Sequence, residues 1–264
     1  MTDWGSNIAL IGHTGFVGSN LAKQREYAAT FNSRNIAELA GRSFDTIVCA
    51  GVSAVKWKAN KEPAADWAGI EKLLDALSVV KAKRFILIST IDVYANPNGV
   101  TEDTPPPAEN HAYGRHRLQV EEFVREHFAE HHIVRLPGLF GDGLKKNVIY
   151  DLLHDNCLDV IQPLSSFQYY GLHHLTDDLQ KVVDQQIRVL NLATEPVPTK
   201  SIIDSFASEK AVGASAGPPV HYDFRSKYDA RWSCHGGYLY SAATVLREVG
   251  EFMRREMKRD GDSS

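Results

Sequence analysis

The chain is poor in cysteine, and its few cysteines lie far apart. Only three occur in 264 residues, and an odd number at wide spacing favours reduced thiols over a disulfide framework or a cysteine-bound metal. The three are Cys49, Cys157 and Cys234. The neighbouring residues His127, His131 and His132 have no fourth partner at metal-ligand spacing, so we also expect no metal.

Long apolar runs and a strong charge of one sign are missing too. No run approaches the ~18 apolar residues that span a bilayer. The polar start Met1-Thr2-Asp3 lacks the apolar core of a signal peptide. A net charge of −4 gives no general attraction to nucleic acid or to acidic membranes. We therefore expect no nucleic-acid or membrane partner and, by default, a cytoplasmic location.

What is present suits a full hydrophobic core, since 43% of the residues are hydrophobic and 23% are charged. Apolar strands alternate with helical stretches in the first half of the chain. We expect strands at 7–11, 28–31, 44–50, 84–89 and 133–136. We expect helices at 16–25, 63–77, 147–153, 176–189 and 241–258. This alternation predicts an α/β fold with a Rossmann-like, doubly wound parallel sheet.

Three glycines follow the first expected strand at a spacing of three. Gly12 permits a sharp turn, Gly15 lets the backbone approach a pyrophosphate, and Gly18 lets the next helix pack against the strand. The free N–H groups at the start of that helix would face the anion. The pattern predicts a dinucleotide site, and the alternative is an ordinary strand-to-helix turn.

Several motifs together resemble the extended short-chain dehydrogenase/reductases, the nucleotide-sugar epimerase/dehydratase family. They are IGHTGFVG at 11–18, ISTIDVY at 88–94, YGRHRL at 113–118 with Glu121 behind it, and LPGLFG at 136–141. The resemblance implies an NAD(P)-binding Rossmann-like domain over 1–143. It implies that 144–264 is mostly substrate-binding, with some segments returning to the sheet.

The family also implies roles for individual residues. The residues implied to bind the cofactor are Gly12, His13, Thr14, Gly15, Phe16, Val17, Gly18, Asn32, Ser33, Arg34, Ala50, Gly51, Ser89, Tyr113, Arg117 and Pro137. Those implied or expected to meet the substrate are Thr90, Asp92, Asn147 and Arg225. The stretch Asn32-Ser33-Arg34 contains an arginine and no acid, which favours NADP over NAD.

The family's proton transfer uses a tyrosine, matched by Tyr113, and a Ser/Thr, matched by Thr90. The family lysine that binds the nicotinamide ribose is replaced here by Arg117. Because positions i and i+4 share a helix face, Arg117 is expected beside Tyr113, where its charge favours tyrosinate. A guanidinium with a pKa above ~12 cannot relay a proton as an amine does.

Two acids complete the comparison with the family. In an extended segment Asp92 points to the same side as Thr90, where it would serve as a base in an epimerisation or cap the following loop. Ile91 replaces the first of the two acids of the family's dehydratases, which disfavours dehydration. Asp66 stands where the family usually has an asparagine, and no role is assigned to it.

We therefore expect an NAD(P)-dependent reductase of a keto group on a nucleotide-linked sugar. One alternative is an epimerase with tightly held NAD, and another is a non-catalytic NADP-binding sensor or partner protein. The resemblance also implies a homodimer formed through the tyrosine helix and the helix before it.

Overall fold

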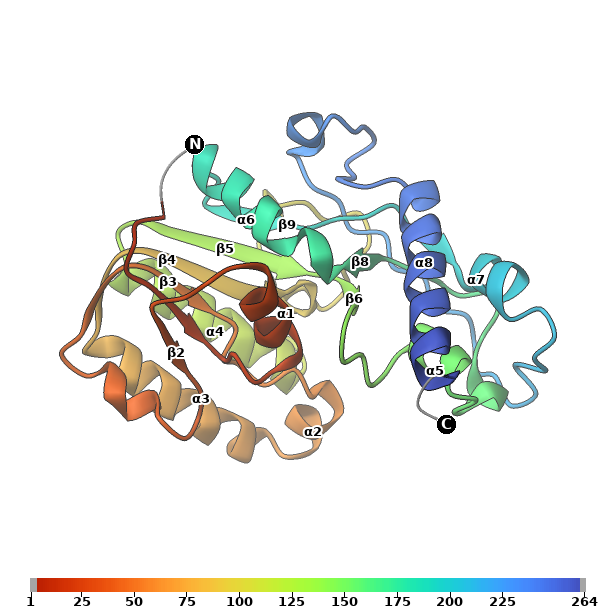
Figure 1. Cartoon of the computed structure of the whole chain (residues 1–264), viewed down its shortest axis with the longest axis horizontal. Helices are drawn as coiled ribbons and strands as arrows, with labels where there is room; N and C mark the ends of the chain where they lie inside the picture. The colour runs from red at the N-terminus through yellow and green to blue at the C-terminus, as the bar shows by residue number, and fades with distance from the viewer. Residues whose placement is uncertain (1–3, 262–264) are drawn as a thin grey trace. The chain divides into compact units, whose positions relative to one another are not determined.

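The computed structural model describes residues 4–261, so the polar start Met1-Thr2-Asp3 lies outside the described part (Figure 1). The chain divides into two compact units. The first contains the residues up to Asn96 together with Thr104–Leu136 and His173–Asn191. The second contains Pro97–Asp103, Pro137–Leu172 and the residues from Leu192 onward.

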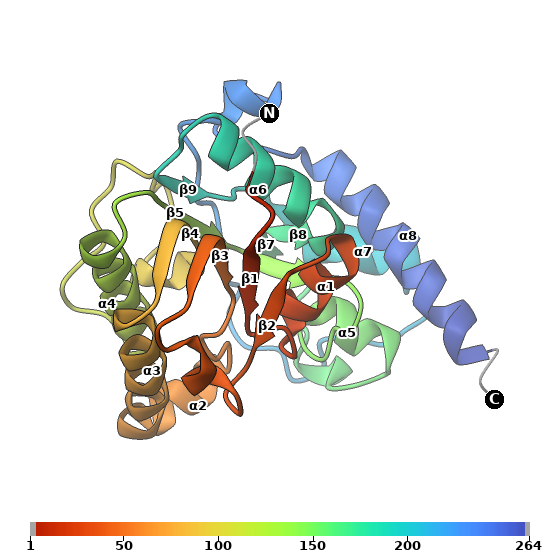
Figure 2. The same ribbon diagram turned by 60° about the vertical axis from the view of Figure 1, so that its left-hand side comes forward.

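The first unit is built on a six-stranded sheet in the order β2-β1-β3-β4-β5-β9, and each neighbouring pair is parallel (Figure 2). The strands are β1 (Ile8–Ile11), β2 (Ala29–Phe31), β3 (Ser43–Cys49), β4 (Lys81–Thr90), β5 (His131–Leu136) and β9 (Val189–Asn191). The predicted Rossmann-like parallel sheet is confirmed, and the five expected strands match β1 to β5 within a few residues.

Helices cover both faces of this sheet. The longer ones are α1 (Phe16–Gln24), α3 (Pro63–Ser78), α4 (Ala112–His127) and α6 (Leu175–Asp184). Figure 2 shows α3 and α4 on one face and α1 and α6 on the other. The shorter ones are η1 (Ile36–Leu39), α2 (Lys56–Lys61), η2 (Ile91–Val93) and η4 (Leu172–His174), the last of which begins in the second unit.

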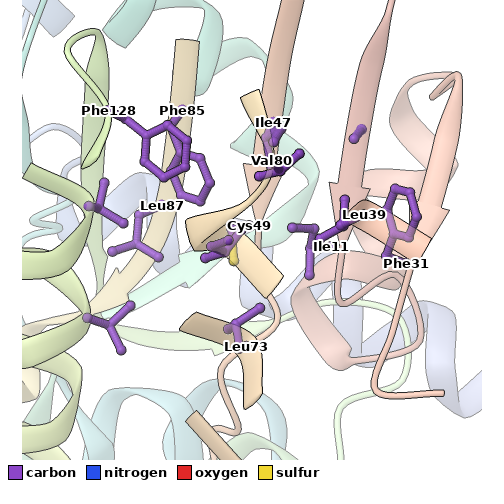
Figure 3. Packing of buried hydrophobic residues seen from close by; sticks show 14 of the residues in the cluster. Ile11, Phe31, Leu39, Ile47, Cys49, Leu73, Val80, Phe85, Leu87 and Phe128 are labelled. Atoms are coloured by element: carbon purple, nitrogen blue, oxygen red, sulfur yellow. The ribbon is translucent and has the colours of Figure 1, made fainter. Parts of the chain in front are cut away.

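The main core of the first unit lies between the sheet and helices α3 and α4. Leu73 of α3 packs among strand residues such as Ile11 and Leu87, as Figure 3 shows. The rings of Phe85 and Phe128 stack with their centroids 4.2 Å apart. Because helices cover both faces, the strands are nearly continuous apolar runs rather than alternating ones.

The second unit has short strands and its own core. Its elements are β6 (Gly138–Phe140), α5 (Val148–Leu153), η3 (Leu158–Val160), β7 (Ser166–Phe167), β8 (Tyr169–Gly171), β10 (Val197–Pro198), α7 (Thr199–Phe206), η5 (Asp229–Trp232) and α8 (Ala242–Gly261). β6 pairs parallel with β8, and β7 pairs antiparallel with β10. The helices α5, α7 and α8 supply most of the buried side chains.

One expected helix is wrong at its end. The pattern predicts a helix at 176–189, but α6 ends at Asp184. Gln186 has a left-handed backbone with φ +54°, which stops the helix, and Val189 then pairs with Ile133 in the sheet.

Within residues 4–261, no helix is both long and apolar enough to cross a membrane.

Candidate active site

The glycine turn after β1 is shaped by two close backbone approaches. Gly12 has φ +88°, and a Cβ there would lie 2.3 Å from the carbonyl oxygen of Ala50. A Cβ on Gly18 would lie 2.1 Å from the carbonyl oxygen of Gly12, so α1 packs this closely only because the side chain is missing. Among the described residues, a Cβ on Gly15 would meet only that oxygen, at 3.3 Å. The turn is therefore open at Gly15, which fits the approach of a pyrophosphate.

This turn lies at the switch point of the sheet. β1 lies between β2 and β3, and the helices α1 and α3 cover opposite faces (Figure 2). Ligands of open α/β sheets bind at the carboxyl ends of the strands at such a point. The predicted cofactor residues at this edge are Gly12, His13, Thr14, Gly15, Phe16, Val17 and Gly18 after β1, Asn32, Ser33 and Arg34 after β2, Ala50 and Gly51 after β3, and Ser89 at the end of β4.

The end of β2 carries the residues predicted to choose the cofactor. Asn32 accepts a hydrogen bond from the backbone N–H of Arg34 at 2.9 Å, and Nδ1 of His13 lies 3.0 Å from the carbonyl oxygen of Phe31. Ser33 and Arg34 are exposed. The segment thus offers an exposed guanidinium and hydroxyl rather than a carboxylate.

Tyr113 is placed by a close contact between α4 and η2. His111 caps α4 by accepting a hydrogen bond from the N–H of Gly114 at 3.0 Å. A Cβ on Gly114 would lie 2.1 Å from the carbonyl oxygen of Asp92, so α4 approaches η2 this closely only with glycine at this position. The Tyr113 side chain is 7% exposed.

The surroundings of Tyr113 keep its phenol protonated. Burial raises the pKa of Tyr113, the charge of Arg117 lowers it, and the charge of Asp92 raises it. A hydrogen bond with Thr90 also lowers this pKa, but the result stays above the usual value of 10.0. At neutral pH, Tyr113 therefore carries its proton.

Arg117 lies over the Tyr113 ring, as the i, i+4 spacing predicts. Its guanidinium carbon is 4.0 Å from the ring centroid. Both terminal nitrogens donate to Asp66, with Nη2 3.0 Å from Oδ1, and Nη2 also donates to the carbonyl oxygen of Ser53. Asp66 accepts a further hydrogen bond from Nδ1 of His116 at 2.8 Å. Asp66, which the sequence left without a role, is the partner of the arginine.

Asp92 has a different partner. Its Oδ1 lies 2.7 Å from Nζ of Lys56 on α2. Asp92 belongs to η2 and not to an extended segment, so the expectation based on strand alternation is wrong. The capping side chain here is that of Thr90, which accepts a hydrogen bond from the N–H of Asp92 at 3.2 Å.

Ser89 contacts a buried ion pair between Glu121 and Arg135, and Glu121 lies one turn after Arg117 on α4. Its hydroxyl donates to Oε1 of Glu121 at 2.6 Å. Arg135 of β5 donates to both oxygens of the same carboxylate, at 2.9 and 2.6 Å, and to the hydroxyl of Tyr94 at 2.7 Å. Glu121 and Arg135 are 0% and 2% exposed. This pair ties α4 to β5, and Ser89 links it to the end of β4, where Thr90 follows.

The remaining predicted residues belong to the second unit. Pro137 lies between β5 and β6. Asn147 caps α5 by accepting hydrogen bonds from the N–H groups of Ile149 and Tyr150, at 3.0 and 3.1 Å. Arg225 donates to Oδ2 of Asp223 and to the carbonyl oxygen of Gly236, at 3.1 Å each. Their predicted contacts with substrate and cofactor stay predictions.

Within the first unit, the structure thus brings Thr90, Asp92, Tyr113 and Arg117 together. Residues that the sequence did not assign also join them, namely Lys56, Asp66, His111, Gly114 and His116. His111 and Gly114 lie within two residues of the tyrosine in the sequence, so they are local to it, although histidine is not a usual capping residue. Lys56 has none, because its contact is made only by folding.

Gly114 gives a direct test of the α4 contact. We expect Gly114→Ala to destabilise the protein by roughly 1–3 kcal/mol, because its Cβ would overlap backbone that cannot move freely. Gly69→Ala in α3 is the matched control: among the described residues, nothing lies within 4 Å of its Cβ. Because alanine favours helix, that change should stabilise by about 0.5–1 kcal/mol. Chemical denaturation of both variants checks the difference, and equal effects would contradict the packing described.

Comparison with known proteins identifies the family. The model of the NAD dependent epimerase/dehydratase family matches residues 24–155, which is half of the chain. The chain therefore belongs to this family, as the sequence motifs predict. A search of curated protein sequences found no match.

Solved structures share the fold at low sequence identity. A dTDP-4-dehydrorhamnose reductase from Bacillus anthracis, in complex with NADP, is 16% identical with a TM-score of 0.72, covering 97% of this chain and 100% of its own. The corresponding reductase from Clostridium acetobutylicum is 15% identical with a TM-score of 0.70, covering 95% and 99%. A UDP-glucose 4-epimerase from Thermotoga maritima, solved with UDP-glucose, is 15% identical with a TM-score of 0.65, covering 96% and 99%.

Proposed function

We propose that this protein is an NAD(P)-dependent reductase of a keto group on a nucleotide-linked sugar. The observation that carries the proposal is a buried, protonated Tyr113 beside Thr90, on the unit that holds the glycine turn. Family membership and the likeness to dTDP-4-dehydrorhamnose reductases support the same reaction class.

In this proposal the protein's side chains handle the proton. The nicotinamide cofactor supplies the hydride for the carbonyl carbon when bound. Tyr113 gives its phenolic proton to the carbonyl oxygen, which becomes the alcohol, and the tyrosinate regains a proton from water. Thr90 holds the oxygen by a hydrogen bond, and Arg117 stabilises the transient tyrosinate.

An epimerase that oxidises and then reduces the same sugar is the second candidate. Asp92 favours it, because a carboxylate lies close enough to Tyr113 to change its pKa, and an epimerase is among the similar structures. The reductase is preferred because an epimerase must first remove a proton, and a tyrosine with a raised pKa is a poor base at neutral pH. Net consumption of the reduced cofactor separates these two. Absence of any turnover would favour the sensor or partner protein.

The proposed cofactor is NADP. The end of β2 offers Ser33 and Arg34, both exposed, for a 2′-phosphate, and one similar reductase was solved with NADP. Asn147 and Arg225 are the proposed contacts to the sugar nucleotide. We also propose a homodimer through α3 and α4, which sedimentation velocity would test, and a cytoplasmic location, which suits the three free cysteines.

Titration with NADPH and NADH tests the proposal. We expect NADPH to bind more tightly than NADH, and binding to be lost in Gly15→Trp because an indole would fill the open side of the turn. Turnover is then measured with 4-keto nucleotide sugars, following oxidation of the reduced cofactor. Failure of both cofactors to bind the folded wild type would overturn the reductase proposal.

A further inference from the structure

Asp66 and Arg117 form a buried ion pair inside the candidate active site. Their side chains are 7% and 4% exposed, and each carboxylate oxygen of Asp66 accepts from a different terminal nitrogen of Arg117. This two-point geometry fixes the plane of a guanidinium, which a single contact cannot do. The pair joins α3 to α4, two helices that pack against each other.

Other contacts support the carboxylate and the guanidinium. His116 donates to Asp66, and its ring lies 5.3 Å from that of Trp67, measured between centroids. The carbonyl oxygen of Ser53 accepts a hydrogen bond from Nη2 of Arg117. Although burial raises the pKa of Asp66, hydrogen bonds from Arg117 and His116 hold it below its ordinary value. Asp66 is therefore an anion at neutral pH.

We propose that Asp66 is a positioning residue that holds the Arg117 guanidinium over the Tyr113 ring and weakens the effect of its charge on the phenol. The inference rests on the proposed function, in which Tyr113 is the proton donor. A lone cation at 4.0 Å from the ring centroid would lower the pKa of Tyr113 more than the ion pair does, because the charge of Asp66 raises this pKa. The pair therefore keeps Tyr113 protonated, and so able to give its proton, up to a higher pH than a lone cation would allow.

The other charged groups near Tyr113 do not replace this effect. Asp92 of η2 raises the pKa of Tyr113, and Lys56 of α2 is paired with Asp92. His111 precedes α4, and burial together with the charge of Lys56 lowers its pKa, so it is neutral at pH 7. Arg117 is therefore the cation that lowers the pKa of Tyr113, and Asp66 limits how far it is lowered.

A charge cycle tests the inference without any substrate. Absorbance titration of tyrosinate, from neutral to alkaline pH, is run on the full chain and on the same variants carrying Tyr113→Phe, because the chain has ten tyrosines. The difference isolates Tyr113. We expect Asp66→Asn to lower the pKa of Tyr113 by about one pH unit or more, a tenfold change in its proton affinity. Arg117→Met should raise the pKa of Tyr113. The double variant, Asp66→Asn with Arg117→Met, should have a Tyr113 pKa close to that of the wild type.

Asp45→Asn provides the matched control, since it removes one negative charge from a partly exposed ion pair with Lys83 elsewhere in the first unit. It should leave the pKa of Tyr113 unchanged. An Asp66→Asn protein that folds and titrates like the wild type would overturn the inference. If Asp66→Asn does not fold, Arg117→Met is compared with the double variant, and equal values for Tyr113 would overturn it.

Activity supplies a second readout. In Asp66→Asn, the loss of reduction rate at high pH should begin at lower pH than in the wild type, by the same shift that the titration measures. Failure of the proposed function is distinguishable, because a protein without turnover still gives the titration result. A titration without the expected shift in an active enzyme would reject the role of Asp66 alone.

Discussion

Tyr113→Phe should lower the rate of carbonyl reduction by about 10²- to 10⁴-fold, the usual contribution of a positioned proton donor. The phenyl ring keeps the packing of a side chain that is 7% exposed, and it keeps the face over which Arg117 lies. Binding of NADPH should therefore change little. The loss should appear in kcat and not in the affinity for the cofactor.

Tyr27→Phe is the matched control for this experiment. Its hydroxyl is also buried, and among the described residues it has no hydrogen-bond partner, so its removal should leave turnover unchanged. Because the pKa of Tyr113 lies above 10.0, the wild-type rate of reduction should stay level at neutral pH and fall only as the pH rises through that pKa. A Tyr113→Phe variant with wild-type turnover would remove Tyr113 from the mechanism.

The parts of this site that the sequence predicts are those whose signal is local. The glycine spacing predicts the turn because its residues contact one another. The geometry at Gly12, Gly15 and Gly18 therefore depends on residues that are close in the sequence. The placement of Arg117 over Tyr113 is predicted in the same way, because the two residues are four positions apart on one helix. The parallel sheet is predicted because its buried strands are apolar on both faces.

The partners of these residues could not be predicted, because they depend on how distant segments pack. Asp66 lies 51 positions before Arg117, and Lys56 lies 36 positions before Asp92. No sequence pattern around Asp66 predicts which side chain donates a hydrogen bond to its carboxylate. The end of α6 was missed for another reason, since a glutamine at φ +54° is an uncommon conformation that composition does not signal.

Substitution of Glu121 is expected to have the largest effect on the free energy of unfolding. It lies on the same face of α4 as Tyr113 and Arg117, and its carboxylate accepts from Ser89, Arg125 and Arg135. Glu121→Gln would leave the charge of Arg135 buried without its partner, so we expect a loss of roughly 3–5 kcal/mol in the free energy of unfolding. Denaturant titration of the full chain measures this loss.

Arg125→Ala separates the buried pair from the exposed one. Arg125 contacts Oε2 of the same glutamate at 2.8 Å, but its side chain is 34% exposed, so its loss should cost only about 0.3–0.5 kcal/mol. The double variant Glu121→Leu with Arg135→Met removes both buried charges and should recover most of the stability. If Glu121→Gln costs no more than Arg125→Ala, the ion pair does not hold α4 to β5. The position of Tyr113 beside Thr90 would then depend on the Gly114 contact with η2 instead.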